Sequence, residues 1–236
     1  MQVRQRTITR RQGLAHCTAL IAAAAALLPT ALRAASATAS ATQKILVVGD
    51  SLSAEYGLKR GSGWVALLEQ RLADEGIGAA VVNASISGDT TSGGRTRLPA
   101  LLKQHGPDIV IIELGGNDAL RGLPIEETRA NLAAMTRAAK DAGARVLLVG
   151  MQIPPNYGRA YGDAFAAVFG TVARNEGAAL VPFLLKGVAD VPQADRMFQP
   201  DRIHPLASAH PRMLENIWPA LETLLKQRSA KRGAAG

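Results

Sequence analysis

Five short, largely apolar runs alternate with stretches of helical periodicity along most of this chain. The apolar runs lie at residues 44–49, 79–83, 108–114, 145–150 and 179–183. Continuous apolar runs of this length are typical of strands buried on both faces. Helical periodicity predicts helices at 64–72, about 93–105, 126–141, a stretch ending near 176, and about 207–227. This alternation predicts a parallel sheet with helices on both faces.

The first 37 residues have the pattern of a cleavable secretory signal. Four arginines fall within the first eleven residues, an apolar run covers 18–28, and small residues suited to cleavage lie near 37–41. The apolar run is too short to span a bilayer. We expect a periplasmic or secreted protein. Export by the Sec route is favoured over twin-arginine export, because Gly13 stands where the latter signal has a bulky apolar residue.

The remaining residues, 38–236, are enough for one well-buried domain. The signal holds five of the 27 basic residues and none of the 19 acidic ones, so the net charge falls from +8 to +3. A basic tail from about residue 228, which we expect to be flexible, carries part of the remaining positive charge. This charge gives no basis for nucleic-acid binding. The single cysteine, Cys17, lies in the signal, which excludes disulfides and thiolate metal sites from the domain.

Polar motifs follow three of the predicted strands. Asp50 and Ser51 come after the first, Gly88 after the second and Asn117 after the third. Each motif has a plain structural alternative: a Gly-Asp-Ser turn, a helix cap at 87–89, and a turn of left-handed residues at 116–118. The carboxyl ends of parallel strands share one edge, however, and ligands bind in the crevice there. The convergence of the three polar motifs on this edge therefore favours a site in which Ser51 is a nucleophile.

A nucleophilic serine needs a general base, and the domain offers three histidines. His105 ends a helix at the wrong edge of the sheet, and His210 lies in the last helix as a surface or packing residue. His204 follows Asp201 by three residues in a loop, so the carboxylate can reach its Nδ1. The alternative for this loop is a helix entry with Pro205 in the first turn. Elimination favours His204 as the base.

Attack on an ester carbonyl creates an oxyanion that fixed donors must stabilise. The candidate donors are the backbone N–H groups of Ser51 and Gly88 and the side-chain amide of Asn117. Glycine lets the backbone approach a substrate closely, and an amide donates without titrating.

These residues resemble the SGNH (GDSL) hydrolase superfamily. The matching blocks are Gly49-Asp50-Ser51-Leu52, Ser87-Gly88-Asp89-Thr90, Gly115-Gly116-Asn117-Asp118 and Asp201-x-x-His204-Pro205. Longer matches at 50–57, 83–94, 114–124 and 154–158 are most similar to its periplasmic arylesterase and multifunctional acyl-CoA thioesterase/lysophospholipase group. The resemblance spans the whole domain. It implies a three-layer α/β/α flavodoxin-like fold around a central parallel five-stranded sheet.

The resemblance also implies residue roles. Ser51 would be the nucleophile, His204 the base and then the acid, and Asp201 the residue that orients His204. Ser51, Gly88 and Asn117 would form the oxyanion hole. Loops at about 119–124 and 153–157 would wall the acyl pocket, and there we expect substrate contacts from Leu120, Pro155 and Tyr157.

Four positions depart from the family's pattern. Glu55 and Ala119 stand where glycine is usual and would stiffen two loops that line the site. Arg202 replaces a glycine and Leu206 an asparagine or threonine. None removes a catalytic group, but they alter the fit of the substrate. Arg202 would add a positive charge at the rim, which favours anionic head groups.

We therefore expect a monomeric serine esterase acting on short- to medium-chain acyl or aryl esters, with thioesters and lysophospholipids as further candidate substrates. It would need no cofactor or metal and insert into no membrane after signal cleavage. One alternative is an O-deacetylase of polysaccharide or cell-wall sugars, against which the scarcity of aromatic residues and the match at 154–157 argue. Another is a catalytically silent binding module, against which the complete catalytic set argues.

Overall fold

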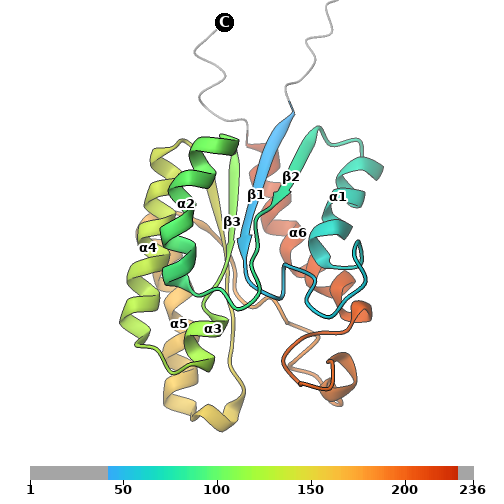
Figure 1. Cartoon of the computed structure of the whole chain (residues 1–236), viewed down its shortest axis with the longest axis vertical. Coiled ribbons are helices and arrows are strands. Elements are labelled where there is room, and N and C mark those ends of the chain that lie inside the picture. Colours follow the sequence, from blue (N-terminus) through green and yellow to red (C-terminus); the bar gives the residue numbers. More distant parts are fainter. Residues whose placement is uncertain (1–41, 228–236) are drawn as a thin grey trace, which may run out of the picture. The chain divides into compact units, whose positions relative to one another are not determined.

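The computed structural model describes residues 42–227, which form a sheet of five parallel strands at the centre of Figure 1. The strands are β1 (Gln43–Gly49), β2 (Ala79–Asn83), β3 (Ile109–Glu113), β4 (Arg145–Val149) and β5 (Ala179–Val181). Their order is β2-β1-β3-β4-β5, and every neighbouring pair is parallel. The chain builds one edge of the sheet, then crosses back over β1 to build the other, as in doubly wound folds.

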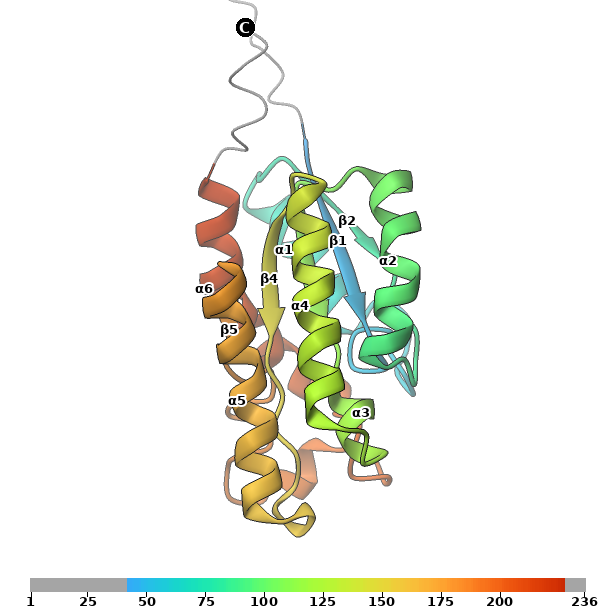
Figure 2. The ribbon, with the colours of Figure 1, turned by 90° about the vertical axis from the view of Figure 1, so that its left-hand side faces the viewer.

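Helices cover both faces of this sheet and make the three predicted layers. Within the described residues, α1 (Trp64–Asp74) and α6 (His210–Lys226) pack together on one face. The other face carries α2 (Thr91–His105), α4 (Ile125–Asp141) and α5 (Arg159–Glu176), which Figure 2 shows side by side. The predicted fold class is thereby confirmed.

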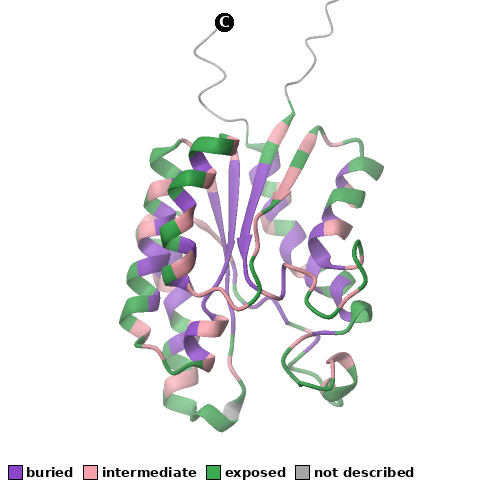
Figure 3. Ribbon diagram, in the orientation of Figure 1, coloured by how far each residue is buried: buried purple, intermediate pink, exposed green. Residues whose placement is uncertain are grey.

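The strands differ in how deeply they are buried, and not every apolar run is a fully buried strand (Figure 3). All five residues of β3 are buried, because β3 lies inside the sheet and has helices on both faces. The second run was expected to be equally buried, but β2 is partly exposed along its length. It lies at the edge of the sheet, so one side of its backbone has no neighbouring strand.

Short helical pieces gather in the loops that leave the carboxyl ends of the strands. These are α3 (Gly116–Leu120), η1 (Pro155–Tyr157), η2 (Ala194–Met197) and η3 (Ala207–Ala209). The structure also places the start of α2 earlier than expected. Thr90 caps that helix, and its hydroxyl accepts a hydrogen bond from the N–H of Gly93 at 3.3 Å.

The predicted signal, its cleavage region at 37–41 and the basic tail from 228 lie outside the described residues. Within 42–227, no helix combines the length and apolar character needed to cross a membrane.

Gly150 follows β4 directly and lies against the backbone that follows β5. Its N–H donates to the Val181 carbonyl at 2.7 Å, and a Cβ at this position would lie 2.3 Å from the carbonyl oxygen of Pro182. Backbone atoms cannot move aside as a flexible side chain can. We predict that Gly150→Ala lowers the free energy of unfolding by about 1–3 kcal/mol, measured by urea denaturation.

Gly162→Ala is a matched control within α5. A Cβ there would meet only Ile153 Cγ1, at 3.8 Å. This variant should lose no stability, and could gain up to ~1 kcal/mol because alanine favours helix. Equal stability of the two variants would contradict the proposed clash.

Candidate active site

Ser51 lies in a tight turn directly after β1. The N–H groups of Ser53 and Ala54 donate to the carbonyl of Asp50 at 3.2 and 3.0 Å, and the N–H of Leu52 donates to the Asp50 carboxylate at 3.0 Å. Asp50 and Leu52 are buried, whereas Ser51 is half-buried. The turn therefore fixes Ser51 at the carboxyl edge of the sheet while leaving it accessible.

Ser51, His204 and Asp201 lie in one hydrogen-bonded line. Ser51 Oγ is 2.8 Å from His204 Nε2, and His204 Nδ1 is 2.7 Å from Asp201 Oδ2. Because an ionised carboxylate only accepts hydrogen bonds, Nδ1 carries the proton and Nε2 is the acceptor. The arrangement can withdraw the proton of Ser51, as general-base activation of a serine requires.

The carboxylate of Asp201 is held in its charged form. Its Oδ1 accepts hydrogen bonds from the N–H groups of Ile203 at 2.9 Å and His204 at 3.0 Å. Desolvation raises the pKa of Asp201, but the hydrogen bonds from His204 and Ile203 outweigh it and bring the pKa to about 2. Asp201 therefore stays ionised at neutral pH and can hold the imidazole in one tautomer.

The other histidines of the described residues lie away from Ser51. His105 ends α2 on the side of the sheet where β3 begins. His210 begins α6 and is buried, and its Nδ1 accepts a hydrogen bond from the N–H of Trp64 at 3.0 Å. Burial lowers the pKa of His210. His210 is thus a neutral packing residue that ties α6 to α1.

Asn117 is carried by α3, which follows β3. Its Nδ2 donates to Oδ2 of the buried Asp50 at 3.0 Å, so the ends of two neighbouring strands are joined where the strand order reverses. An amide nitrogen has two hydrogens, which allows one to be held by Asp50 while the other meets a bound oxyanion. A left-handed turn at 116–118 is ruled out, since these residues are helical and the positive φ belongs to Gly115, at 121°.

Gly88 lies in the loop after β2 with a φ of 78°, a conformation that disfavours any side chain. Its carbonyl accepts a hydrogen bond from Arg121 at 2.8 Å, which ties the loop to the end of α3. The neighbouring Asp89 accepts from Arg97 Nε at 2.7 Å, and Arg97 also donates to the carbonyl of Gly49 at 3.3 Å. Two arginines thus fasten this loop to the segments that carry Asn117 and Ser51.

A cavity of about 760 Å³ opens at this edge of the sheet. The predicted site residues on its wall are Ser51, Asn117, Leu120, Tyr157, Asp201 and His204. Gly88 does not line it, and the side chain of Pro155 lies outside what the structure describes. Much of the remaining wall is apolar, including Met151, Ile153, Phe183, Leu185 and Phe198. A cavity of this size and lining suits a small, partly apolar molecule.

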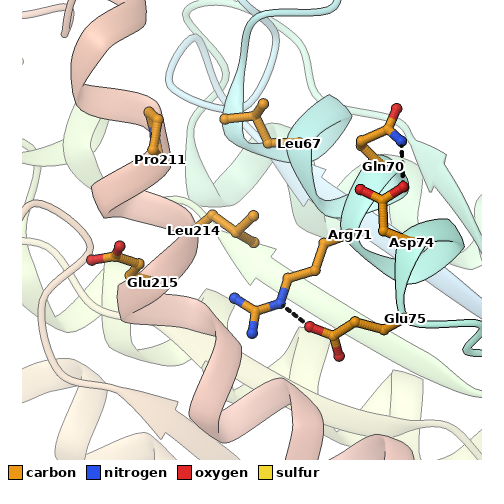
Figure 4. Close-up of a pocket in the computed structure, with 8 residues that line it drawn as sticks. All are labelled: Leu67, Gln70, Arg71, Asp74, Glu75, Pro211, Leu214 and Glu215. Atoms are coloured by element: carbon orange, nitrogen blue, oxygen red, sulfur yellow. Dashed lines mark hydrogen bonds and ion pairs between the residues drawn. The ribbon is translucent and has the colours of Figure 1, made fainter.

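A second hollow, of about 420 Å³, lies between α1 and α6 (Figure 4). There Arg71 Nε pairs with Glu75 at 2.7 Å and Gln70 donates to Asp74 at 2.8 Å. The guanidinium of Arg71 also lies 3.9 Å from the ring centre of Trp218. None of the predicted site residues lines this hollow, and within 42–227 no three His, Asp or Glu side chains gather to hold a metal.

Residues 47–212 match the model of the GDSL-like Lipase/Acylhydrolase family. Esterase TesA of Pseudomonas aeruginosa is 56% identical over 186 residues, 79% of this chain and 91% of that protein. A crystal structure of a protein named TesA is 56% identical and has a TM-score of 0.74, with coverage of 77% of this chain and 99% of that one. The chain belongs to the GDSL-like lipase/acylhydrolase family.

Two further relatives of this GDSL-like chain are similar over most of their length. The arylesterase of Vibrio mimicus is 43% identical over 182 residues, 77% of this chain and 90% of that protein. The thioesterase 1/protease 1/lysophospholipase L1 of Escherichia coli is 41% identical over 191 residues, 81% of this chain and 89% of that protein. The resemblance inferred from the motifs is confirmed, and the chain is a carboxylic ester hydrolase.

A second carboxyl group of this GDSL-like hydrolase is buried beneath the Ser51 turn. Glu113 ends β3 with 2% of its surface exposed, and it accepts a hydrogen bond from Ser53 Oγ at 2.7 Å. Burial, followed by the charge of Asp50, raises the pKa of Glu113 well above its usual value. Burial also raises the pKa of Asp50, to about 6. Because Asp50 accepts two N–H bonds, we take Asp50 as the ionised partner and Glu113 as the protonated one.

Buried polar side chains also anchor the helix that carries Asn117. Asp118 accepts hydrogen bonds from the N–H of Thr91 at 2.9 Å, from the Thr91 hydroxyl, and from the Thr128 hydroxyl at 3.3 Å. Asn131 donates to Thr91 Oγ1 at 3.1 Å. The network joins α2, α3 and α4 and thereby holds the neighbouring Asn117 in place.

Two departures from the family's pattern take a left-handed backbone. Glu55 has a φ of 59° and Arg202 a φ of 60°, conformations natural to glycine. The carboxylate of Glu55 accepts from the N–H groups of Gly61 at 3.0 Å and Gly63 at 2.7 Å, which offsets the strain. Ala119 is buried in α3 and does not itself line the cavity, although its neighbours Asn117 and Leu120 do.

Glu113 should make stability depend on pH. Its folded pKa lies above the ordinary 4.5, so the folded protein binds this proton more tightly than the unfolded chain does. The free energy of unfolding should therefore fall as the pH rises above ~4.5 toward the folded pKa. Glu113→Gln keeps an acceptor for Ser53 but does not titrate. As the pH rises from about 5 to 8, we predict that the free energy of unfolding of this variant falls less than that of the wild type.

Urea denaturation at a series of pH values measures this difference. The exposed Glu69→Gln on α1 is the matched control and should follow the wild type at each pH. If Glu113→Gln and the wild type lost stability in parallel, the buried proton would be assigned to the wrong residue.

Proposed function

We propose that this hydrolase cleaves short- to medium-chain acyl esters and aryl esters through an acyl-enzyme on Ser51. The observation that carries the proposal is the line from Ser51 Oγ through His204 to Asp201, with contacts of 2.8 and 2.7 Å, at the wall of a largely apolar cavity. Asp201 orients His204, His204 is the base, and Ser51 is the nucleophile.

The first half of the reaction forms the acyl-enzyme. Ser51 Oγ attacks the carbonyl carbon while its proton passes to His204 Nε2. The imidazolium that results is stabilised by Asp201, which stays ionised because its pKa is about 2. The tetrahedral intermediate then collapses, and His204 gives its proton to the departing alcohol or thiol. In the second half, water attacks the acyl carbonyl while His204 takes its proton. Collapse of this intermediate breaks the ester bond to Ser51 Oγ, which regains its proton from His204 as the carboxylic acid leaves.

The negative oxygen of the tetrahedral intermediate is met by three neutral donors. We assign these to the N–H groups of Ser51 and Gly88 and to the second N–H of Asn117, whose first N–H is bonded to Asp50 at 3.0 Å. Gly88 has a left-handed φ of 78°, a conformation natural to glycine, and the lack of a side chain lets its backbone N–H approach a substrate closely.

The substrate class follows from the cavity wall. Leu120 and Tyr157 lie on it among other apolar residues, which suits an acyl chain, and Tyr157 is 39% exposed at the rim. Thioesters and lysophospholipids fit the same chemistry, and relatives carry the names thioesterase and lysophospholipase. We take the enzyme to be periplasmic or secreted, from the signal pattern in residues 1–37.

Ser51→Ala tests the function directly. The variant should lose p-nitrophenyl ester turnover by a factor of ~10⁴ or more, since the acyl-enzyme cannot form. Thermal unfolding should stay cooperative, because a half-buried hydroxyl is removed without loss of core packing. Turnover retained at the wild-type level would overturn the assignment of the nucleophile.

Labelling with a fluorophosphonate separates the alternatives. The wild type should be labelled at Ser51 with one-to-one stoichiometry, whereas a silent binding module would not react. Labelling without turnover of simple esters, together with release of acetate from acetylated polysaccharide, would favour the sugar deacetylase.

Leu120 and Tyr157 should set the chain-length preference. Truncating either to alanine enlarges the acyl pocket, so we predict that the preference among p-nitrophenyl esters shifts by two or more carbons or flattens, with kcat/KM for the best substrate falling roughly 10-fold. Leu67→Ala, in the hollow between α1 and α6, is the control and should keep the wild-type profile. An unchanged profile in both pocket variants would remove these residues from the acyl site.

A further inference from the structure

The loop that carries Asp201 and His204 is closed on itself by a short antiparallel contact. Phe198 and Pro205 form an isolated bridge, the N–H of Gln199 donates to the carbonyl of His204 at 2.7 Å, and the N–H of Leu206 donates to Met197 at 2.8 Å. The acid and base therefore sit at the tip of a small hairpin. Something must hold this hairpin against the Ser51 turn, since no strand of the sheet includes it.

The side chain of Gln199 makes that connection. Its Nε2 donates to the carbonyl of Tyr56 at 2.9 Å, across 143 residues of sequence, and to the carbonyl of Pro205 at 3.2 Å. Tyr56 belongs to the Ser51 turn, because its own N–H donates to the carbonyl of Ser51 at 3.3 Å. One amide group thus links the backbone of the Ser51 turn to the backbone beside His204.

Two neighbours show that the fit around this amide is close. Gly57 has a φ of 70°, and a Cβ at this position would lie 2.1 Å from Gln199 Oε1. The ring of Tyr56 lies against the imidazole of His204, with ring centres 4.3 Å apart and planes inclined by 37°. The carbonyl that Gln199 binds and the ring that touches His204 therefore belong to the same residue.

We propose that Gln199 is a positioning residue that sets the approach of His204 Nε2 to Ser51 Oγ. This proposal rests on the proposed function, since it assumes that His204 is the base. The chemistry demands an amide: both partners of Nε2 are carbonyl oxygens, so the group between them must offer two N–H donors. A carboxylate of the same shape would face two carbonyls with no hydrogen to give, and would lose both bonds.

If Gln199 positions His204, replacing it should lower kcat and leave KM nearly unchanged. Gln199 lies outside the cavity wall, so substrate binding does not depend on it directly. A shift of the hairpin by a fraction of an ångström lengthens the 2.8 Å contact between Ser51 and His204, on which both proton transfers depend.

The test uses two variants of different chemistry. Gln199→Glu keeps the shape, and Gln199→Met removes the donors without adding charge, so it carries the test should the charge disturb folding. Each should lower kcat for p-nitrophenyl esters by about 10- to 100-fold, with KM within about 3-fold of the wild type. Gln104→Glu, exposed near the end of α2, is the control for the charge change and should keep wild-type kinetics. Unchanged kcat in both Gln199 variants would overturn the proposal.

A double-mutant cycle with His204→Ala separates positioning from general loss of structure. If Gln199 acts through His204, Gln199→Met should lower the residual turnover of His204→Ala by no more than about 2-fold. An equal loss with and without the imidazole would mean that Gln199 acts elsewhere, and would also overturn the proposal. Failure of the proposed function would be recognised independently, because Ser51→Ala would then retain turnover.

Discussion

The hydrogen bond between the Asp50 carboxylate and the Asn117 amide is the contact on which the catalytic edge depends. Burying a charged carboxylate is costly unless hydrogen bonds compensate it, and here two do. One comes from the N–H of Leu52 and shapes the Ser51 turn, and the other comes from Asn117. A single anion thus fixes both the turn of Ser51, the proposed nucleophile, and the side chain of Asn117, a proposed oxyanion donor. Glu113 lies beneath it, and its proton spares the interior a second negative charge.

The sheet and the proposed triad could be predicted from the sequence. The strands have local patterns, and the base could be chosen by elimination. An apolar run marks each inner strand, and the alternation with helices leaves few parallel topologies. Three histidines in the domain reduce the choice of base to His204, and Asp201 precedes it by three residues. Asn117 could be placed at the cavity because it follows a strand whose carboxyl end lies at that edge, whereas Gly88 follows β2 but does not line the cavity.

The hydrogen bonds that hold the site residues in place could not be predicted from the sequence, because they join residues far apart along the chain. Thr91 and Asp118 are 27 residues apart, and Tyr56 and Gln199 are 143 apart. A buried threonine at the start of a helix, or a half-buried glutamine in a polar loop, has no periodic pattern that distinguishes it from an exposed residue. Glu113 did leave a trace, since it is the charged residue inside the apolar stretch 109–114. A charged residue at such a position indicates that a buried hydrogen-bond partner lies nearby, and here that partner is Ser53.

The spacing of the triad along the chain has a consequence for biosynthesis. Asp201 and His204 are three residues apart, whereas 153 residues separate His204 from Ser51. During synthesis Ser51 leaves the ribosome long before His204, and the two residues meet only after the chain between them has folded. A nascent or unfolded chain therefore carries an ordinary, unactivated serine. Hydrolysis by the proposed triad therefore requires the completed fold.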